Sequence, residues 1–348
     1  MLKTQGYAAP VAKAPLAVHS FERREPREND VVVEIQYCGI CHSDIHQVRN
    51  EWGEGIFPMV PGHEITGIVT TTGSKVTKYK VGDKVGVGVF VDSCRACKQC
   101  KNGLEQYCTE GFVGTYNGRE YDGTPTIGGY SDKIVVDENY VFRIPNNLPL
   151  QGAAPLLCAG ITTYSPLLHW HAASGMNIAI IGLGGLGHMG VKFAHALGAE
   201  VTVLSHSLNK QADGNRLGAD QFYATSDRAT FKKLRGTFDL MINTVSADID
   251  WNQYLKLLKV DGTMVVVGLP EKQVSISAST LVDGRRSIAG SMIGSLQETQ
   301  QMLDFCGEHN IVCDVEMVNI QDVNAAYERV LKSDVKYRFV IDMASLKS

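Results

Sequence analysis

Hydrophobic and polar positions follow two different patterns along the chain. Up to about residue 150, short runs rich in Val are broken by Gly and Pro, as in residues 31–35 and 84–89. This pattern predicts a mainly β domain. From about Gly175, short apolar runs alternate with segments of helix length. That alternation predicts an α/β region built of βαβ units around a parallel, doubly wound sheet.

Four apolar runs are the strand candidates of the second pattern: residues 178–181, 201–204, 238–243 and 264–268. Each is short and apolar on both faces, as expected where helices cover both sides of a parallel sheet. After about residue 294, the pattern predicts a helix over 296–309, another helix over 323–331 and a closing strand over 337–342.

Length and composition fit a folded chain of two domains. The 348 residues exceed what one ordinary core accommodates, and 44% hydrophobic with 20% charged residues is typical of a globular protein. A net charge of -4 gives no electrostatic reason to expect nucleic acid or an anionic membrane as a partner. Neither a signal peptide nor a membrane span is recognisable, so a cytoplasmic location is expected.

The nine cysteines are an odd number, so they cannot all pair in disulfides. Four of them lie within fifteen residues, with two, two and seven residues between successive members: Cys94, Cys97, Cys100 and Cys108. Four thiolates at such spacing can close a tetrahedral structural zinc site with bonds of about 2.3 Å. Two disulfides or an iron–sulfur cluster are the alternatives, and a reducing compartment disfavours the disulfides.

A glycine-rich turn follows the apolar run 178–181 and opens a helical stretch expected over 186–197. Its G-x-G-x-x-G residues are Gly182, Leu183, Gly184, Gly185, Leu186 and Gly187. In this context the glycines allow a tight turn and a close approach of the backbone to a pyrophosphate at the helix N-terminus. A glycine-rich βα turn without a ligand is the alternative.

The end of the second predicted strand indicates which nucleotide binds. A site for NAD usually offers Asp or Glu there to the ribose hydroxyls. This chain instead has Ser205, His206, Ser207 and, three residues on, Lys210. No carboxylate repels a 2′-phosphate, and the hydroxyls and the ammonium can donate to one. The residues therefore favour NADP(H).

Three more residues stand in distinctive local settings. Cys41 is followed by His-Ser-Asp, His63 lies in a Gly-His-Glu element, and Cys158 precedes Ala-Gly. Taken singly, each has a plain alternative, because cysteine is often a small buried hydrophobe and histidine a satisfied core residue.

The whole chain resembles the zinc-containing medium-chain dehydrogenases, and most closely the cinnamyl-alcohol-dehydrogenase-like aldehyde reductases of bacteria and plants. The four-cysteine segment, the Gly-His-Glu element and residues 128–131, 159–164 and 337–342 carry this resemblance. It implies a GroES-like, mainly β catalytic domain over 1–153 and 294–348, a Rossmann nucleotide-binding domain over 154–293, and a homodimer.

The resemblance also implies a second, catalytic zinc, held by Cys41, His63 and Cys158 with a fourth position open for substrate, the Cys₂His pattern of alcohol dehydrogenases. It places the Glu64 carboxylate beside the metal, able to approach it when substrate leaves. It makes Asp44 the carboxylate that orients the ring of His63.

Further residues gain roles from the same resemblance. Ser43 would begin proton transfer from the substrate oxygen, and His46 would carry the proton towards solvent, unless it is a plain surface histidine. Trp52 would form an apolar wall of the substrate pocket, with core packing as the alternative.

For the cofactor, the resemblance places Thr162 near the nicotinamide, Val267 and Gly268 at its carboxamide, and Arg338 among the cofactor-binding residues. A solvated surface charge is the alternative for Arg338. His206 departs from the more usual serine, which leaves the strength of the NADP(H) preference open.

These inferences predict a zinc-dependent, NADP(H)-preferring alcohol dehydrogenase that interconverts primary alcohols and aldehydes, with the zinc as Lewis acid and the cofactor as hydride carrier. A zinc-free reductase of the same fold would lack both metal-binding sets. A polyol dehydrogenase often has an acidic residue where this chain has Cys158. A nucleotide-sensing or structural zinc protein would bind NADP(H) and zinc without turnover.

Overall fold

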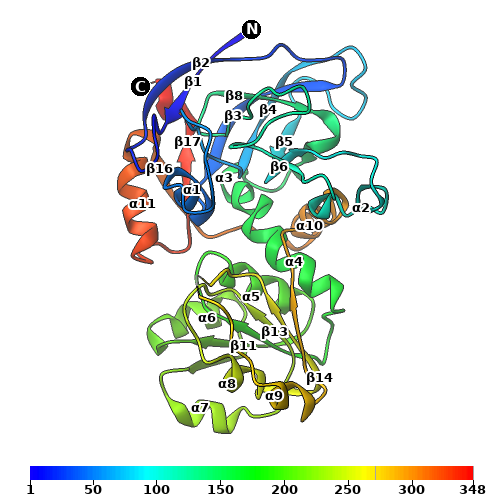
Figure 1. The fold of residues 1–348 in the computed structure, drawn as a ribbon, viewed down its shortest axis with the longest axis vertical. Helices are drawn as coiled ribbons and strands as arrows, with labels where there is room; N and C mark the ends of the chain where they lie inside the picture. The colour runs from blue at the N-terminus through cyan, green and yellow to red at the C-terminus, as the bar shows by residue number, and fades with distance from the viewer. Residues whose placement is uncertain (271, 348) are drawn as a thin grey trace. The chain divides into compact units, whose positions relative to one another are not determined.

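A computed structural model describes residues 1–270 and 272–347 of the chain. They form two compact units (Figure 1). The first unit joins Met1–Cys158 with the segment from Ser295 to the end of the described residues, and the second is Ala159–Gly294. No helix in the part of the chain described here has the length and apolar character needed to cross a membrane.

The first unit is mainly β, as the Val-rich runs predict. Its largest sheet has seven strands in the order β16-β17-β3-β4-β5-β9, with β8 also paired to β3, and the segment after residue 295 supplies β16 and β17. Val31 and Val33 of β3 are fully buried, and β3 pairs antiparallel with β17, β4 and β8. Strands from before and after the second unit are therefore joined in one sheet.

The strands of this unit are β1 (Leu2–Ala8), β2 (Ala17–Arg23), β3 (Asp30–Gly39), β4 (Ile65–Thr72), β5 (Lys84–Val87), β6 (Phe90–Asp92), β7 (Val113–Gly114), β8 (Lys133–Asp137), β9 (Phe142–Arg143), β16 (Val315–Asn319) and β17 (Arg338–Asp342). Its helices are α1 (His42–Val48), α2 (Lys98–Lys101), α3 (Leu150–Ala153), α10 (Leu296–His309) and α11 (Val323–Leu331).

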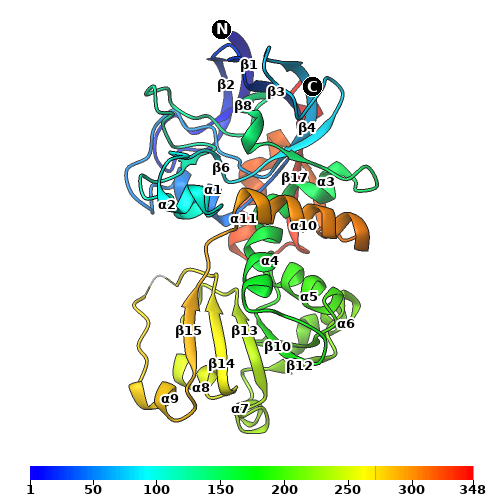
Figure 2. The same cartoon turned by 90° about the vertical axis from the view of Figure 1, so that its right-hand side faces the viewer.

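The second unit holds a six-stranded parallel sheet in the order β12-β11-β10-β13-β14-β15. Figure 2 shows its strands side by side, from β15 through β14 and β13 to β10. Numbered along the chain, this order is 3-2-1-4-5-6, the doubly wound order of dinucleotide-binding domains. The central strand β10 is apolar on both faces, with Ile178, Ala179 and Ile180 fully buried.

The strands of the second unit are β10 (Asn177–Ile181), β11 (Glu200–Ser205), β12 (Gln221–Ala224), β13 (Phe238–Asn243), β14 (Leu258–Val266) and β15 (Ser287–Gly290). Its helices are α4 (Ala159–His169), α5 (Gly187–Ala196), α6 (Gln211–Leu217), α7 (Arg228–Lys233), α8 (Trp251–Leu255) and α9 (Ala278–Val282).

The predicted elements differ from the structure mainly at the edges of the parallel sheet. Strands β12 and β15 have no predicted counterpart, because they are short edge strands with partly exposed side chains and lack a continuous apolar run. The run predicted over 264–268 is also displaced, since β14 begins at Leu258 and ends at Val266. Its first half exposes Val260 and Asp261 and lacks a continuous apolar run, which conceals the strand.

The helix predicted over 296–309 coincides with α10, and its first turn explains the sharp start. Ser295 at the N-cap accepts a hydrogen bond from the amide of Glu298, and the Glu298 carboxylate accepts one from the Ser295 amide. This reciprocal capping box satisfies two amides that would otherwise lack partners at the helix end. Asn310, in the left-handed region with φ 54°, ends the helix.

Candidate metal and nucleotide sites

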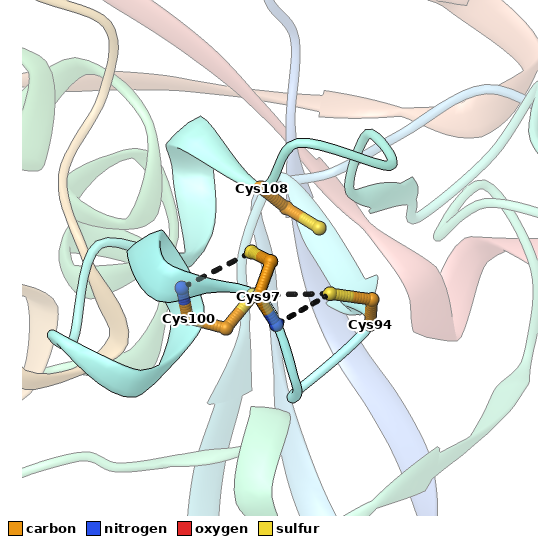
Figure 3. Close-up of side chains that lie close together, drawn as sticks. All are labelled: Cys94, Cys97, Cys100 and Cys108. Carbon is orange, nitrogen blue, oxygen red and sulfur yellow. Dashed lines mark hydrogen bonds between the residues drawn. The ribbon is translucent and has the colours of Figure 1, made fainter.

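The four clustered cysteines converge on one centre. Their sulfur atoms all lie within 4.8 Å of one another, and Figure 3 shows how the loop and the short helix α2 bring the side chains together. The Sγ atoms of Cys94 and Cys100 are 3.8 Å apart, far beyond disulfide bonding. Zinc–sulfur bonds of about 2.3 Å in a tetrahedron place two sulfurs roughly 3.8 Å apart. The donor set and its spacing therefore fit a structural zinc.

Backbone amides of the same loop point at these sulfurs. The amide of Cys97 donates to Sγ of Cys94 at 3.3 Å, and that of Cys100 donates to Sγ of Cys97 at 3.4 Å. The bond from the Cys100 amide, with others from Thr109, lowers the pKa of Cys97 to about 5. A loop that stabilises thiolate in this way is prepared for a cation.

A second cluster joins residues far apart in sequence. The ligand atoms of Cys41, His63, Glu64 and Cys158 lie within 4.8 Å of one another, and all four side chains are buried. Cys41 is the N-cap of α1, His63 and Glu64 immediately precede β4, and Cys158 ends the short 3₁₀ turn Ala154–Leu157. The Sγ atoms of Cys41 and Cys158 are 3.9 Å apart, which again fits tetrahedral zinc.

The two cysteines of this cluster differ in the direction in which the pKa of each thiol is shifted. The hydrogen bond with Cys158 lowers the pKa of Cys41 well below its usual range, against the effect of burial. The same contact raises the pKa of Cys158. Since zinc binds thiolates, metal binding here must remove a proton from Cys158.

Asp44 links the cluster to the surrounding backbone. Its carboxylate is fully buried and accepts hydrogen bonds from the amides of Cys41 at 2.9 Å and Gly62 at 3.1 Å. Oδ1 of Asp44 also lies 3.2 Å from Nδ1 of His63. A ring held through Nδ1 presents Nε2 to a metal, so the structure brings Asp44 to the place that an orienting carboxylate needs.

Glu64 and Arg338 form a buried ion pair beside the sulfurs. Burial raises the pKa of Glu64 to about 7, although Arg338 opposes this shift. Oε2 of Glu64 and Nε of Arg338 are buried without a hydrogen-bond partner. A Cβ on Gly39 would lie 2.0 Å from Oε2 of Glu64, so only glycine leaves room for this carboxylate. The alternative of a solvated surface charge is wrong for Arg338, which is 6% exposed.

The remaining residues predicted for this region lie on or after α1. Sγ of Cys41 lies 3.6 Å from Oγ of Ser43, within hydrogen-bond distance. Nδ1 of His46 is 2.5 Å from a carboxylate oxygen of Glu51, and the His46 ring stacks on Trp52 with centroids 4.8 Å apart. Trp52 is 48% exposed, so the alternative of core packing is wrong. The parts predicted for Ser43, His46 and Trp52 in catalysis stay predictions.

Tyr116 is a residue of this site that the sequence analysis missed. It follows β7 and is 8% exposed, and its ring stacks on that of His63 with centroids 5.8 Å apart and planes 21° from parallel. Burial, and then the charge of Asp44, raise the pKa of this phenol well above its usual value. No spacing in the sequence connects Tyr116 to His63.

The glycine turn connects β10 to α5 in the second unit. Gly182 has φ 90°, a conformation that side chains rarely adopt. A Cβ on Gly187 would lie 2.0 Å from the carbonyl oxygen of Gly182, whereas one on Gly184 would meet nothing within 4 Å. The turn is thus closed on its inner side and open at Gly184, and this fits a backbone that a phosphate approaches.

The residues predicted to select the nucleotide gather beside this turn. Ser205 ends β11, and His206 and Ser207 follow it. Nζ of Lys210 donates to the carbonyl oxygen of Leu183 at 3.0 Å, so the ammonium lies at the glycine turn itself. A cation and hydroxyls at the end of the second strand, without a carboxylate, fit the 2′-phosphate of NADP(H).

Asn243, at the carboxyl end of β13, was also missed. It is fully buried and faces Ile181 of β10 in the sheet register, and its Nδ2 has no hydrogen-bond partner. Ligands of doubly wound sheets bind at the carboxyl ends of strands where the order reverses, which here is between β10 and β13. The signal was a polar residue at the end of an apolar run.

Three of the other predicted cofactor residues are also in the second unit. Thr162 is buried in α4. Val267 and Gly268 follow β14, and both amides donate to the carbonyl oxygen of Asn243 at 3.0 Å. Contact of Thr162, Val267, Gly268 or Arg338 with the cofactor stays a prediction.

Comparison with known proteins agrees with this geometry. The family model described as alcohol dehydrogenase GroES-like domain matches residues 27–146, and that described as zinc-binding dehydrogenase matches residues 185–308. NADP-dependent alcohol dehydrogenase C 1 of Mycolicibacterium smegmatis is 61% identical, and the match covers 100% of both chains.

Two solved structures resemble the chain over nearly its whole length. A cinnamyl alcohol dehydrogenase of Sorghum bicolor is 47% identical, with a TM-score of 0.95 over 98% of both chains. The CAD of Helicobacter pylori, complexed with NADP(H), is 43% identical, with a TM-score of 0.92 over 99% of both chains. With two candidate zinc sites and a nucleotide turn, the chain belongs to the zinc-containing medium-chain alcohol dehydrogenases, as an NADP-dependent alcohol dehydrogenase of the cinnamyl-alcohol-dehydrogenase-like type.

Proposed function

We propose that this NADP-dependent alcohol dehydrogenase acts mainly as an aldehyde reductase, converting aliphatic and aromatic aldehydes to primary alcohols. The observation that carries the proposal is the buried set of Cys41, His63 and Cys158, whose sulfurs lie 3.9 Å apart and whose imidazole is held by Asp44. The Sorghum bicolor relative, named for cinnamyl alcohol, supports aromatic substrates. The NADP(H) preference supports the reductive direction, since NADPH is the usual reductant of biosynthesis.

In this proposal Cys41, His63 and Cys158 hold the catalytic zinc, and the four clustered cysteines hold the structural one. Zinc bound there would act as a Lewis acid on the substrate oxygen, and NADPH would supply the hydride. Asp44 keeps the His63 ring in one orientation through Nδ1. Arg338 balances the charge of Glu64, so that three anionic groups can share one buried site.

The proton that the new alcohol needs would come through Ser43, which lies beside Cys41. His46 would exchange protons with solvent, since its ring is partly exposed and contacts the Glu51 carboxylate. Trp52 would contribute an apolar wall for substrates. Its exposed face and its stacking on His46 support a place at the site's entrance.

The nucleotide would lie along the glycine turn, with its 2′-phosphate near Ser205, His206, Ser207 and Lys210. Two features support this position: the open space at Gly184, and the side-chain nitrogen Nδ2 of Asn243, which is buried without a hydrogen-bond partner. Thr162, Val267 and Gly268 would contact the nicotinamide end. The first unit would be the catalytic domain and the second the nucleotide-binding domain. A homodimer and a cytoplasmic location stay predictions.

A panel of aldehydes and alcohols tests the proposal. We expect cinnamaldehyde, benzaldehyde and straight-chain aldehydes to be reduced with NADPH, with kcat/KM above that for the matching alcohols with NADP. NADPH oxidation without any aldehyde specificity, or faster oxidation of a polyol such as mannitol, would contradict it. Binding of NADPH without turnover of any aldehyde would instead favour a nucleotide-sensing protein.

A further inference from the structure

A buried histidine lies at the start of the helix that follows the glycine turn. His188 is the second residue of α5 and is 0% exposed. Nδ1 of its ring lies 3.3 Å from the carbonyl oxygen of Gly184, at hydrogen-bond distance. Because a carbonyl oxygen only accepts hydrogen bonds, Nδ1 carries the proton and donates it. This contact ties the ring to the backbone of the turn.

The carbonyl of Gly184 receives two donors from the same residue. The backbone amide of His188 donates to it at 3.0 Å, with the spacing of an α-helical bond, and Nδ1 of the ring supplies the second donor. A carbonyl oxygen has two lone pairs, so both bonds form together. With one donor the peptide unit could still rotate, whereas two donors hold its plane.

The direction of this carbonyl decides the direction of the next amide. A peptide unit is planar and trans, so the N–H of Gly185 points opposite to the C=O of Gly184. Holding the carbonyl towards His188 therefore turns the Gly185 amide away from that residue. A Cβ on Gly184 would meet no atom within 4 Å, so the backbone is open to a ligand here. Amides at a helix N-terminus are groups that bind phosphate.

We propose that His188 is a positioning residue for the pyrophosphate of NADP(H). It acts through the carbonyl of Gly184, and its task is to keep the amide of Gly185 in the orientation in which it donates to a phosphate oxygen. The inference rests on the proposed place of the nucleotide along the glycine turn. The ring needs no contact with the nucleotide, since it acts on the backbone that binds it.

Two variants with the same side-chain amide at different distances from the backbone test this role. The nitrogen of an asparagine side chain can take the place of Nδ1, whereas that of a glutamine lies one bond farther out. His188→Gln should therefore weaken NADPH binding by about three- to tenfold, the effect of losing one hydrogen bond. His188→Asn should restore most of that affinity. Titration calorimetry on the purified holoenzyme measures each Kd.

Adenosine 2′-phosphate separates the positioning of the pyrophosphate from general damage to the fold. This probe has the 2′-phosphate of NADPH but no pyrophosphate, so we expect His188→Gln to bind it with the Kd of the parent enzyme. NADH has the pyrophosphate without the 2′-phosphate, so its binding should weaken by the same factor as that of NADPH. Weaker binding of adenosine 2′-phosphate by that factor would overturn the inference.

His195→Gln is the matched control on the same helix. His195 is exposed and lies beside Gly218, since a Cβ on that glycine would be 2.6 Å from Cγ of the His195 ring. This variant should bind NADPH as the parent does, and a loss equal to that in His188→Gln would contradict the inference. Parent affinity in His188→Gln would contradict it as well, and so would an equal loss in His188→Asn.

Folding is checked by thermal unfolding without ligand. If His188→Gln fails to fold, His188→Leu also removes the donor at Nδ1 while it fills the buried space with an apolar side chain. It should weaken NADPH binding by the same factor and leave adenosine 2′-phosphate unaffected. Parent affinity for NADPH in His188→Leu would overturn the inference.

Failure of the inference differs from failure of the proposed nucleotide site. If Gly184→Ala binds NADPH as the parent enzyme does, the pyrophosphate does not lie at this turn, and the proposed site itself is contradicted. If Gly184→Ala binds NADPH more weakly while His188→Gln binds it as the parent does, only the role of His188 is contradicted.

Discussion

Replacing Gly187 by alanine is the sharpest test of the nucleotide turn, because the turn packs against itself at that residue. The new Cβ would lie 2.0 Å from the carbonyl oxygen of Gly182 and 3.2 Å from Oγ1 of Thr244. The first of these atoms belongs to the backbone and has no rotamer by which to move away. The turn must therefore open by roughly 1 Å, and overpacking of this kind costs about 1–3 kcal/mol.

Gly184→Ala provides the matched control in the same turn. A Cβ at residue 184 would meet no atom within 4 Å, and Gly184 is not among the glycines with positive φ. The free energy of unfolding should therefore stay unchanged. The methyl group would instead project into the space that a phosphate needs, so NADPH should bind more weakly, by about tenfold for a loss of 1.4 kcal/mol.

Thermal unfolding and fluorescence titration with NADPH separate the two effects. For Gly187→Ala we expect Tm of the second unit to fall by about 3–10 °C, from 1–3 kcal/mol at the sensitivity of a domain the size of Ala159–Gly294, together with weaker NADPH binding. For Gly184→Ala we expect the parent Tm and only the weaker binding. An unchanged Tm in Gly187→Ala would refute the packing argument, and parent affinity in Gly184→Ala would refute the phosphate position.

Further predictions concern the metals and the nucleotide preference. Metal analysis should return about two zinc ions per chain, and Cys158→Ser should keep one of them and lose aldehyde reduction; a single ion in the parent enzyme contradicts the two-site arrangement. Asp44→Asn should lose the catalytic zinc about 10–100-fold faster, because one amide oxygen cannot accept all the hydrogen bonds that two carboxylate oxygens accept. The rate of zinc transfer to a chelator measures this, and a rate equal to that of the parent enzyme would refute it. Ser205→Asp should raise KM for NADPH more than for NADH, and an unchanged ratio means that the preference lies elsewhere. Catalytic zinc should be lost as the pH falls, because a raised pKa of Cys158 makes its thiol regain a proton readily; zinc content after dialysis at pH 5 and pH 8 measures this, and equal content contradicts it.

The periodicity of hydrophobic residues was sufficient to predict those helices and strands that have a buried face along their whole length. The helices predicted over 296–309 and 323–331 and the strand over 238–243 coincide with α10, α11 and β13. Strands β12 and β15 could not be found in this way, because edge strands bury less of each side chain. Their pairing depends on a neighbouring strand that no local pattern shows.

The residues of the candidate sites also differ in whether the sequence alone could group them. The four clustered cysteines could be grouped from their spacing alone, whereas Cys41, His63 and Cys158 could be grouped only through a family resemblance. Tyr116 could not be found, since its importance depends on which group the fold places beside it. Asn243 left one signal that was not used, a polar residue at the end of an apolar run. The burial of Arg338 against Glu64 was equally invisible, because a sequence does not show which cation loses its water.

The two candidate metal sites also differ in when they can form during synthesis of the chain. The four cysteines lie between residues 94 and 108, so this site needs only one short loop and can close while most of the chain is still unmade. The second cluster draws on residues 41 to 158, and the arginine that neutralises Glu64 is residue 338, on β17. Its buried charges are therefore balanced only once the last strand has joined β3, which makes that final pairing the step that completes the catalytic metal site.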